Sequence, residues 1–318
     1  MREFKHYNLK DWLLFQPVVD AFKNSRNDLY SSVYCRRLPK EHDSFLAHLK
    51  QQEHTDNIII SIAYNCVETI SLLIDSTEKN LNNCLLIIAD NSSSSTSRKA
   101  IKALCKKRGV SYFGLPSNKT KHANRSHSLA VQWCYANIVD SIRPEIFTFL
   151  DHDLLPKKPY DFKAHLKDQP FYGAFWKSKY NEAWQLWAGF CTFRYVAVST
   201  YKLNFLYDFS NGLDTGGRNY SRLYQYFDNH ALNFATNDKV RFLPDLQQPQ
   251  NTVTLQIIDN CWIHMGGAAH LAGYEKRHFD FSKQMASLDL VDKWSIYSST
   301  CFTQVEPFRN KGRKPVQK

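Results

Sequence analysis

Between residues 57 and 151 the chain alternates short apolar runs with segments of helical periodicity, and this alternation constrains the fold most strongly. The apolar runs are typical of buried parallel strands. They cover residues 57–63, 84–89, 110–113 and 146–150. Apolar side chains recur at helical spacing in the segments between them, 67–80, 96–108 and 122–140. The order β-α-β-α-β-α-β predicts an α/β fold of Rossmann-like type, with a mostly parallel central sheet and helices on both faces.

Polar residues follow three of these runs, at the point where each run ends. They are Tyr64-Asn65, Asp90-Asn91 and Asp151-His152-Asp153. In open α/β sheets, ligands bind beyond the carboxyl ends of the strands. The sequence therefore predicts a nucleotide-type site at this edge of the sheet.

Asp151 and Asp153 are the first candidate metal ligands. An apolar strand delivers both carboxylates, one residue apart, to an exposed turn. Carboxylate oxygens suit Mg²⁺ or Mn²⁺, and such an ion neutralises charge on a leaving diphosphate. The alternative interpretation is a turn whose aspartates cap the next segment.

Several of these stretches resemble the GT-A glycosyltransferases, especially the family 2-like group. Three matching stretches follow strands: Ser61-Ile62-Ala63-Tyr64-Asn65, Ile88-Ala89-Asp90-Asn91-Ser92-Ser93 and the Asp151-His152-Asp153 motif. The fourth is the segment from Asn118 to Arg125, which includes Asn124. The family's usual glycines are absent from the last segment. The resemblance implies a nucleotide-sugar donor held by Ala63, Tyr64, Asn65, Asp90, Asn91, Asn118, Asn124, Asp151 and His152.

Residues 170–260 are rich in aromatic and polar side chains, which we interpret as short mixed strands and loops that complete the sheet. The stretch 186–194 resembles the segment that lines the donor-sugar and acceptor pocket of the same enzymes. Gly189 would let the backbone approach a sugar, and Trp187 offers a ring face for stacking. The alternative is a core strand with a packing glycine.

Two further candidates come later in the chain. Inverting GT-A enzymes carry an acidic general base beyond the DxD motif, and Asp214 in the glycine-containing loop 212–217 is the candidate by position, with Asp228 as the reserve. The alternative interpretation is an aspartate that serves only a turn. His264 follows an apolar strand-like segment and would complete the metal site, as a late histidine does in many metal-dependent GT-A enzymes. An imidazole ligand suits Mn²⁺ better than Mg²⁺. His270 is the alternative ligand.

These features predict a metal-dependent glycosyltransferase. We expect a helical extension over 1–55, a GT-A domain over 56–302 and a basic tail over 303–318. Within the domain, 56–155 is the nucleotide-binding half and 156–302 the acceptor half. The reaction would move a sugar from a nucleotide-diphosphate sugar, with UDP favoured, to a hydroxyl of a glycan or glycolipid, with inversion.

The formal net charge of +11 makes anionic partners plausible. A nucleic-acid-binding protein is one alternative, but no basic helix or aromatic-basic RNA motif accompanies the charge, so no nucleic acid is expected. A nucleotidyltransferase would carry a glycine-rich basic loop after its first strand, and this chain has none there. A glycosyltransferase-like protein without catalysis is the remaining alternative.

The chain shows no apolar signal core, and no run approaches the length of a membrane span. Its eight cysteines form no CxxC pair and are expected to be reduced, which fits a cytoplasmic protein. The apolar stretch 12–15 is interpreted as a packed helix face. The basic surface and tail suggest peripheral contact with an anionic membrane at its inner face, where a lipid-linked acceptor would lie.

Overall fold

The computed structural model describes residues 4–118, 120, 122–242 and 253–265. The predictions for His270 and for the tail 303–318 lie outside these described residues. The division of the chain into an extension and two halves stays a prediction.

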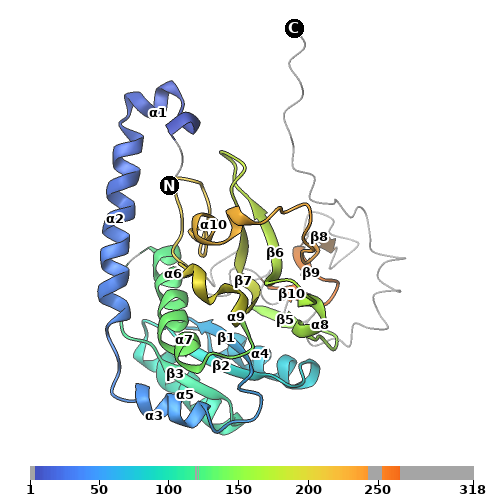
Figure 1. The fold of residues 1–318 in the computed structure, drawn as a ribbon. Coiled ribbons are helices and arrows are strands. Elements are labelled where there is room, and N and C mark those ends of the chain that lie inside the picture. Colours follow the sequence, from blue (N-terminus) through green and yellow to red (C-terminus); the bar gives the residue numbers. More distant parts are fainter. Residues whose placement is uncertain (1–3, 119, 121, 243–252, 266–318) are drawn as a thin grey trace.

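The central sheet has six strands in the order β3-β2-β1-β4-β7-β6 (Figure 1). The strands are β1 (Asn57–Ala63), β2 (Leu85–Asp90), β3 (Ser111–Gly114), β4 (Ile146–Asp151), β6 (Phe171–Lys177) and β7 (Trp184–Arg194). The first four are parallel, and β7 joins β4 antiparallel and pairs with β6 as a hairpin. A mixed α/β fold with a mostly parallel central sheet is thus confirmed.

Helices cover both faces of this sheet. They are α4 (Val67–Asn80) and α5 (Ser95–Arg108) on one face, with α6 (Ala123–Cys134) on the other. Successive residues of a strand pack in the two core layers, one on each face of the sheet. In β1, Ile58 and Ile60 pack in the layer with α6, whereas Ile59 packs in the layer with α4. Burying each such isoleucine contributes about 1.5–3 kcal/mol. This alternation explains why the strands are apolar throughout.

The long helical stretch predicted over 122–140 divides into three pieces. After α6 the chain forms a π-helical segment (Tyr135–Val139) and then α7 (Asp140–Ile142). The helix ends at Arg143, whose backbone has left-handed dihedral angles. The segment Ile138–Val139 stays buried in the same core layer, so the irregular turn keeps the apolar face directed at the sheet.

The basic cluster at Lys106, Lys107 and Arg108 has a local explanation. These residues form the last turn of α5, where positive charge interacts favourably with the helix dipole. Gly109 follows with a left-handed φ of 67°, and its N–H caps carbonyl groups of that turn. Arg108 also pairs with Asp75 and Glu78 of α4. The cluster therefore serves the end of α5, and Arg108 also connects that end to α4.

A smaller sheet of four strands, in the order β5-β10-β9-β8, lies against the second half of the fold. Its strands are β5 (Leu154–Pro156), β8 (Asn237–Phe242), β9 (Val253–Ile258) and β10 (Trp262–His264). All its pairings are antiparallel. Three short helices accompany this half, α8 (Phe162–Leu166), α9 (Tyr195–Val198) and α10 (Asn219–Arg222).

The N-terminal region is helical, with α1 (Leu9–Leu13), α2 (Gln16–Cys35) and α3 (His42–Leu49). Tyr34 and Leu49 join the main core, and α2 packs on α6. The interpretation of residues 12–15 as a packed face is wrong, because all four side chains are exposed. Within the described residues, no helix has both the length and the hydropathy needed to span a membrane.

All seven described cysteines are free thiols. Five are buried, and Cys35 and Cys84 are half-buried. Burial raises the pKa of the Cys84 thiol to about 11, so this sulfur stays protonated at neutral pH. These side chains act as small apolar packing groups.

Candidate functional site

The parallel register brings the predicted polar residues to one edge of the sheet. Ala63 at the end of β1 lies beside Asp90 of β2, and Ile62 lies beside Asp151 of β4. The two aspartates therefore flank β1 at the carboxyl edge of the strands, as expected from the alternation of strands and helices.

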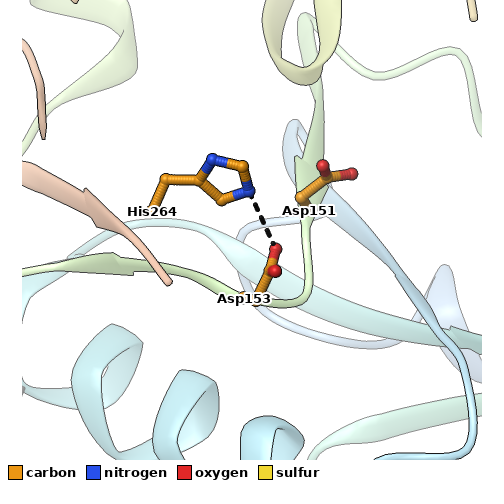
Figure 2. A group of neighbouring side chains, drawn as sticks. All are labelled: Asp151, Asp153 and His264. Atoms are coloured by element: carbon orange, nitrogen blue, oxygen red, sulfur yellow. Dashed lines mark ion pairs between the residues drawn. The ribbon is translucent and has the colours of Figure 1, made fainter. Parts of the chain in front are cut away.

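A tight turn between β4 and β5 carries the two candidate ligands Asp151 and Asp153. Strand β10 pairs with β5 and places His264 opposite Leu154, directly after Asp153. The N–H of Met265 donates to the carbonyl oxygen of Asp153 at 2.8 Å, which fixes this pairing. Figure 2 shows His264 pointing toward the two carboxylates. The sheet thus joins two segments that lie more than a hundred residues apart.

One ligand atom from each of Asp151, Asp153 and His264 lies within 4.8 Å of the others. The Nε2 atom of His264 is 3.4 Å from Oδ1 of Asp153. Two carboxylates and one imidazole form a donor set that suits a divalent cation such as Mn²⁺ or Mg²⁺. The residues present therefore fit the implied ion.

Gln256 of β9 orients the imidazole of His264. Its Oε1 atom is 2.8 Å from Nδ1 of His264, and its Nε2 atom donates to Asn237 at 2.9 Å. An amide oxygen only accepts, so Nδ1 is the donor to Gln256. Nε2 is then the nitrogen that would offer its lone pair to a bound metal ion, which is the tautomer that a metal ligand needs.

The electrostatics of this group also favour a cation. Burial raises the pKa of Asp151, Asp153 raises it further, and His127 opposes the rise. Burial alone lowers the pKa of His264, but Asp153 and Asp151 outweigh that effect and raise it. Two neighbouring carboxylates in a buried place repel each other, and a positive charge between them relieves the repulsion.

A cleft of about 460 Å³ opens at this edge of the sheet. The predicted site residues that line it are Tyr64, Asn91, Asn124, Asp151, His152, Asp153, Trp187, Asp214 and His264. The Nε2 atom of His152 is buried there and has no hydrogen-bond partner within the protein. We call this cavity the first cleft.

A second cleft, of about 380 Å³, shares Asn124, Trp187 and Asp214 with the first. Its further aromatic lining consists of Trp176, Tyr180, Tyr207 and Phe209. Aromatic faces of this kind give a large apolar contact area with a polar edge. The three shared residues form the boundary between a polar cleft and an aromatic one.

Asp214 is exposed at this boundary. Its Oδ1 atom accepts hydrogen bonds from Nδ2 of Asn124 at 2.9 Å and from the N–H of Thr215 at 2.8 Å. Both partners are neutral donors, so they orient the carboxylate without neutralising it. A carboxylate fixed between two clefts can accept a proton from a ligand that enters either one.

Several predicted donor-binding residues support the loops and do not line either cleft. Asp90 is fully buried, and its carboxylate accepts from the N–H of Ser92 and the hydroxyl of Tyr112, both at 2.8 Å. Asn65 bonds to the serine-rich loop through Ser93. Asn118 donates to Asn91 at 2.9 Å. Their role in donor binding, like that of buried Ala63, stays a prediction.

Gly189 of β7 lies next to the carboxylate of Asp151, a candidate metal ligand. A Cβ atom added there would come within 2.3 Å of the Trp187 ring and 2.6 Å of Oδ2 of Asp151. No side chain fits in this space, so the glycine allows the strand, the ring and the carboxylate to pack together. The structure thus gives Gly189 a role in positioning Asp151 and Trp187.

The reserve candidate Asp228 does not line either cleft. It is exposed, and its Oδ1 atom accepts from the N–H of His230 at 2.9 Å within a turn. Its position gives no support to a role as general base.

Sequence reasoning missed His127, which lines the first cleft. Its Nε2 atom is 3.6 Å from Oδ1 of Asp151. Because His127 is three residues beyond Asn124 in α6, both side chains share a helix face. That spacing was the signal in the sequence. The aromatic residues of the second cleft come from β6, the loop after it and residues 207–209, and no local pattern connects them.

Fold and site together define an α/β protein with a candidate divalent-cation site at the carboxyl edge of its parallel strands. No protein-family model matches the sequence, and no curated protein does. One solved structure with a detectable likeness is a mannosyltransferase from Pyrobaculum calidifontis in complex with GDP-Man and Mn²⁺. It is 12% identical, with a TM-score of 0.30, over 56% of this chain. The match spans 55% of that protein, about half its length.

Proposed function

We propose that this chain is a metal-dependent glycosyltransferase that moves a sugar from a nucleotide-diphosphate donor to a hydroxyl acceptor. The observation that carries the proposal is the convergence of Asp151, Asp153 and His264 in a cleft that adjoins a second, aromatic cleft. Donor and acceptor would occupy the two clefts. Two adjoining clefts suit a reaction between two substrates, and a binding module for one ligand has no need of the second.

The donor would occupy the first cleft, with the two aspartates and His264 holding Mn²⁺ or Mg²⁺. The bound ion would neutralise charge on the diphosphate leaving group. Tyr64, Asn91, Asn124 and His152 line the cleft and supply polar and stacking groups to the nucleotide. A UDP-sugar is our favoured donor because GT-A enzymes, which the motifs resemble, most often use one.

The acceptor, a glycan or a glycolipid, would occupy the second cleft. Trp187 belongs to both clefts and offers its ring to a sugar on either side. Asp214 would take the proton from the acceptor hydroxyl as the new glycosidic bond forms. Attack from the side opposite the leaving group would give inversion at the anomeric carbon.

The test is Mn²⁺-dependent release of nucleoside diphosphate from a panel of UDP-, GDP-, dTDP- and CMP-sugars. We expect slow hydrolysis of one donor by the wild type. Asp153→Ala should lower it by at least about a hundredfold, because removing a ligand weakens both the ion and the donor that it holds. Asp168→Ala replaces an exposed aspartate outside both clefts and should leave the rate unchanged.

Asp214→Asn separates binding from transfer. This variant should keep the Mn²⁺-dependent rise in melting temperature with the nucleotide, and should lose sugar transfer by about 10²–10⁴-fold. If neither hydrolysis nor nucleotide-dependent stabilisation occurs with any donor, the donor site is wrong. Stabilisation without turnover, even with acceptors supplied, would instead indicate a nucleotide-sugar-binding protein without catalysis.

A further inference from the structure

Helices α1 and α2 expose a group of large apolar side chains. The most exposed are Leu9, Leu13, Leu14, Phe15, Val18 and Phe22, and each has more than 60% of its surface accessible. Trp12 is 46% exposed in the same segment. We call residues 9–22 the apolar tip. Exposed clusters of this size indicate a contact surface, because single apolar residues are common on protein surfaces but contiguous groups are not.

The opposite, inward face of α2 is mostly polar between its ends, where Pro17 and Tyr34 are also buried. Asp20, Asn24, Asn27 and Ser31 are buried along it. The carboxylate of Asp20 accepts from Tyr7 at 3.1 Å and from Gln16 at 2.6 Å. The usual arrangement of an amphipathic surface helix is therefore reversed. Arg218 bonds to Asn24, and Tyr34 at the far end of α2 packs in the main core, so both polar and apolar contacts hold α2 to the body. The apolar residues near its N-terminus are left for an outside partner.

The apolar tip is exposed on several sides. Leu13, Leu14 and Phe15 are consecutive and all exposed, and they occupy the corner between the two helices. In α2, Val18 and Val19 point about 100° apart, and both are exposed. Figure 1 shows α1 at the far end of α2, projecting beyond the sheets. A second protein would cover one face of the apolar tip. A lipid layer would surround it on all sides, which suits side chains that are exposed in several directions.

Basic residues accompany the tip. Lys5, Lys10 and Arg26 are exposed in and beside it. Of the acidic residues in this stretch, Asp11 of α1 is partly exposed, Asp20 is buried and Asp28 pairs with Arg218. The accessible charge is therefore mostly positive, which complements anionic lipid headgroups. Trp12 is a side chain typical of the boundary between headgroups and acyl chains.

Helix α2 lies beside the second cleft. The Nζ atom of Lys23 is 5.7 Å from the ring centroid of Phe209, which lines that cleft. Arg218, four residues after Asp214, hydrogen-bonds to Asn24 at 3.0 Å. A lipid surface that holds the tip would therefore lie on the side of the molecule that carries the aromatic cleft.

We propose that the apolar tip inserts into the headgroup region of an anionic lipid membrane and holds the second cleft near that surface. The insertion does not depend on the proposed reaction. It adds to that proposal a class of acceptor, one anchored in lipid, which the second cleft could reach.

The test is flotation of the full chain with vesicles, comparing phosphatidylcholine alone with mixtures that contain phosphatidylglycerol. We expect binding to the anionic vesicles that falls as salt is raised. Leu13→Glu and Phe22→Glu should each lower vesicle affinity by at least about tenfold, because a charge replaces an inserted apolar side chain. The matched control is Val196→Glu, a similar change at a residue 79% exposed on α9, which should bind like the wild type.

Because the substituted side chains are exposed, their replacement should leave the melting temperature unchanged. Absence of wild-type flotation at low salt would overturn the proposal, and so would equal loss in Val196→Glu. Light scattering of the same proteins tests the competing occupant. A stable dimer that Leu13→Glu converts to a monomer would show that a second copy covers the tip. Failure here leaves the donor-hydrolysis test unaffected, so the two proposals can be judged separately.

Discussion

At the scale of single residues, the candidate site depends on neighbours that position its side chains. Gly189 provides space, Gln256 selects a tautomer, and Asn124 orients Asp214. Each of these effects is local and has a defined partner atom, so each can be tested by a single substitution.

Gly189→Ala tests the need for space beneath Asp151. The new methyl group would overlap the Trp187 ring and the Asp151 carboxylate, so one of them must move. We expect donor hydrolysis to fall at least about tenfold, since small displacements of reacting groups are costly. Gly114→Ala is the matched control, because a Cβ there meets its nearest atom at 3.5 Å. Equal rates in the two variants would contradict the packing argument.

Gln256→Leu tests the orientation of His264. Loss of the acceptor on Nδ1 frees the imidazole to rotate or to change tautomer. Removing such an outer partner typically weakens metal binding about 10–100-fold. The measurement is the Mn²⁺ concentration that half-saturates the rise in melting temperature. Gln225→Leu, at an exposed position outside both clefts, should behave as the wild type does.

At the scale of elements, α4 and α2 are both helices with a regular pattern of apolar residues, but they bury different faces. In α4 the apolar positions Ile70, Leu73 and Ile74 are fully buried against the sheet. In α2 the buried positions are mostly polar, and Phe22 and Leu29 face outward. The helices therefore contribute to stability in different ways.

A pair of leucine substitutions makes this contrast measurable. Leu73→Ala should lower the free energy of unfolding by about 2–5 kcal/mol, because it leaves a cavity in a packed core. Leu29→Ala should change it by less than about 0.5 kcal/mol, because that side chain is 69% exposed. Urea unfolding followed by circular dichroism gives both values. A large loss in Leu29→Ala would mean that its side chain is covered by a partner, such as a second copy, in solution.

At the scale of the whole molecule, the net charge of +11 is distributed in small groups. Lys106, Lys107 and Arg108 serve the end of α5, and Arg218 binds Asp28 on α2. Lys163 and Arg194 share Glu145. These basic residues have partners within the fold, which weakens the case for a nucleic-acid surface.

This distribution predicts weak, salt-sensitive contact with nucleic acid. A mobility shift with random DNA should disappear at about 0.15 M salt, because scattered charges release few counterions together. A shift that persists at that ionic strength, with a steep salt dependence, would favour the nucleic-acid-binding alternative instead.

The sequence alone determined the parallel half of the fold and the turn at Asp151 and Asp153. Both are local: strand and helix periodicity can be recognised within about ten residues, and parallel strands must present their carboxyl ends at one edge. The boundaries agree closely, with β2 at Leu85–Asp90 against the expected 84–89.

Tertiary structure decided which distant side chains meet. His264 reaches Asp153 only because β10 pairs with β5, and Asp214 meets Asn124 only because a loop folds over α6. Those contacts depend on long-range pairing that no local pattern encodes. Tertiary contacts also decide which face of α2 is buried. The sequence predicts a helix there, but partners such as Tyr7 and Arg218 determine which of its residues face inward. Local preferences form the elements, and packing between elements selects the face that each buries and the residues that form the site.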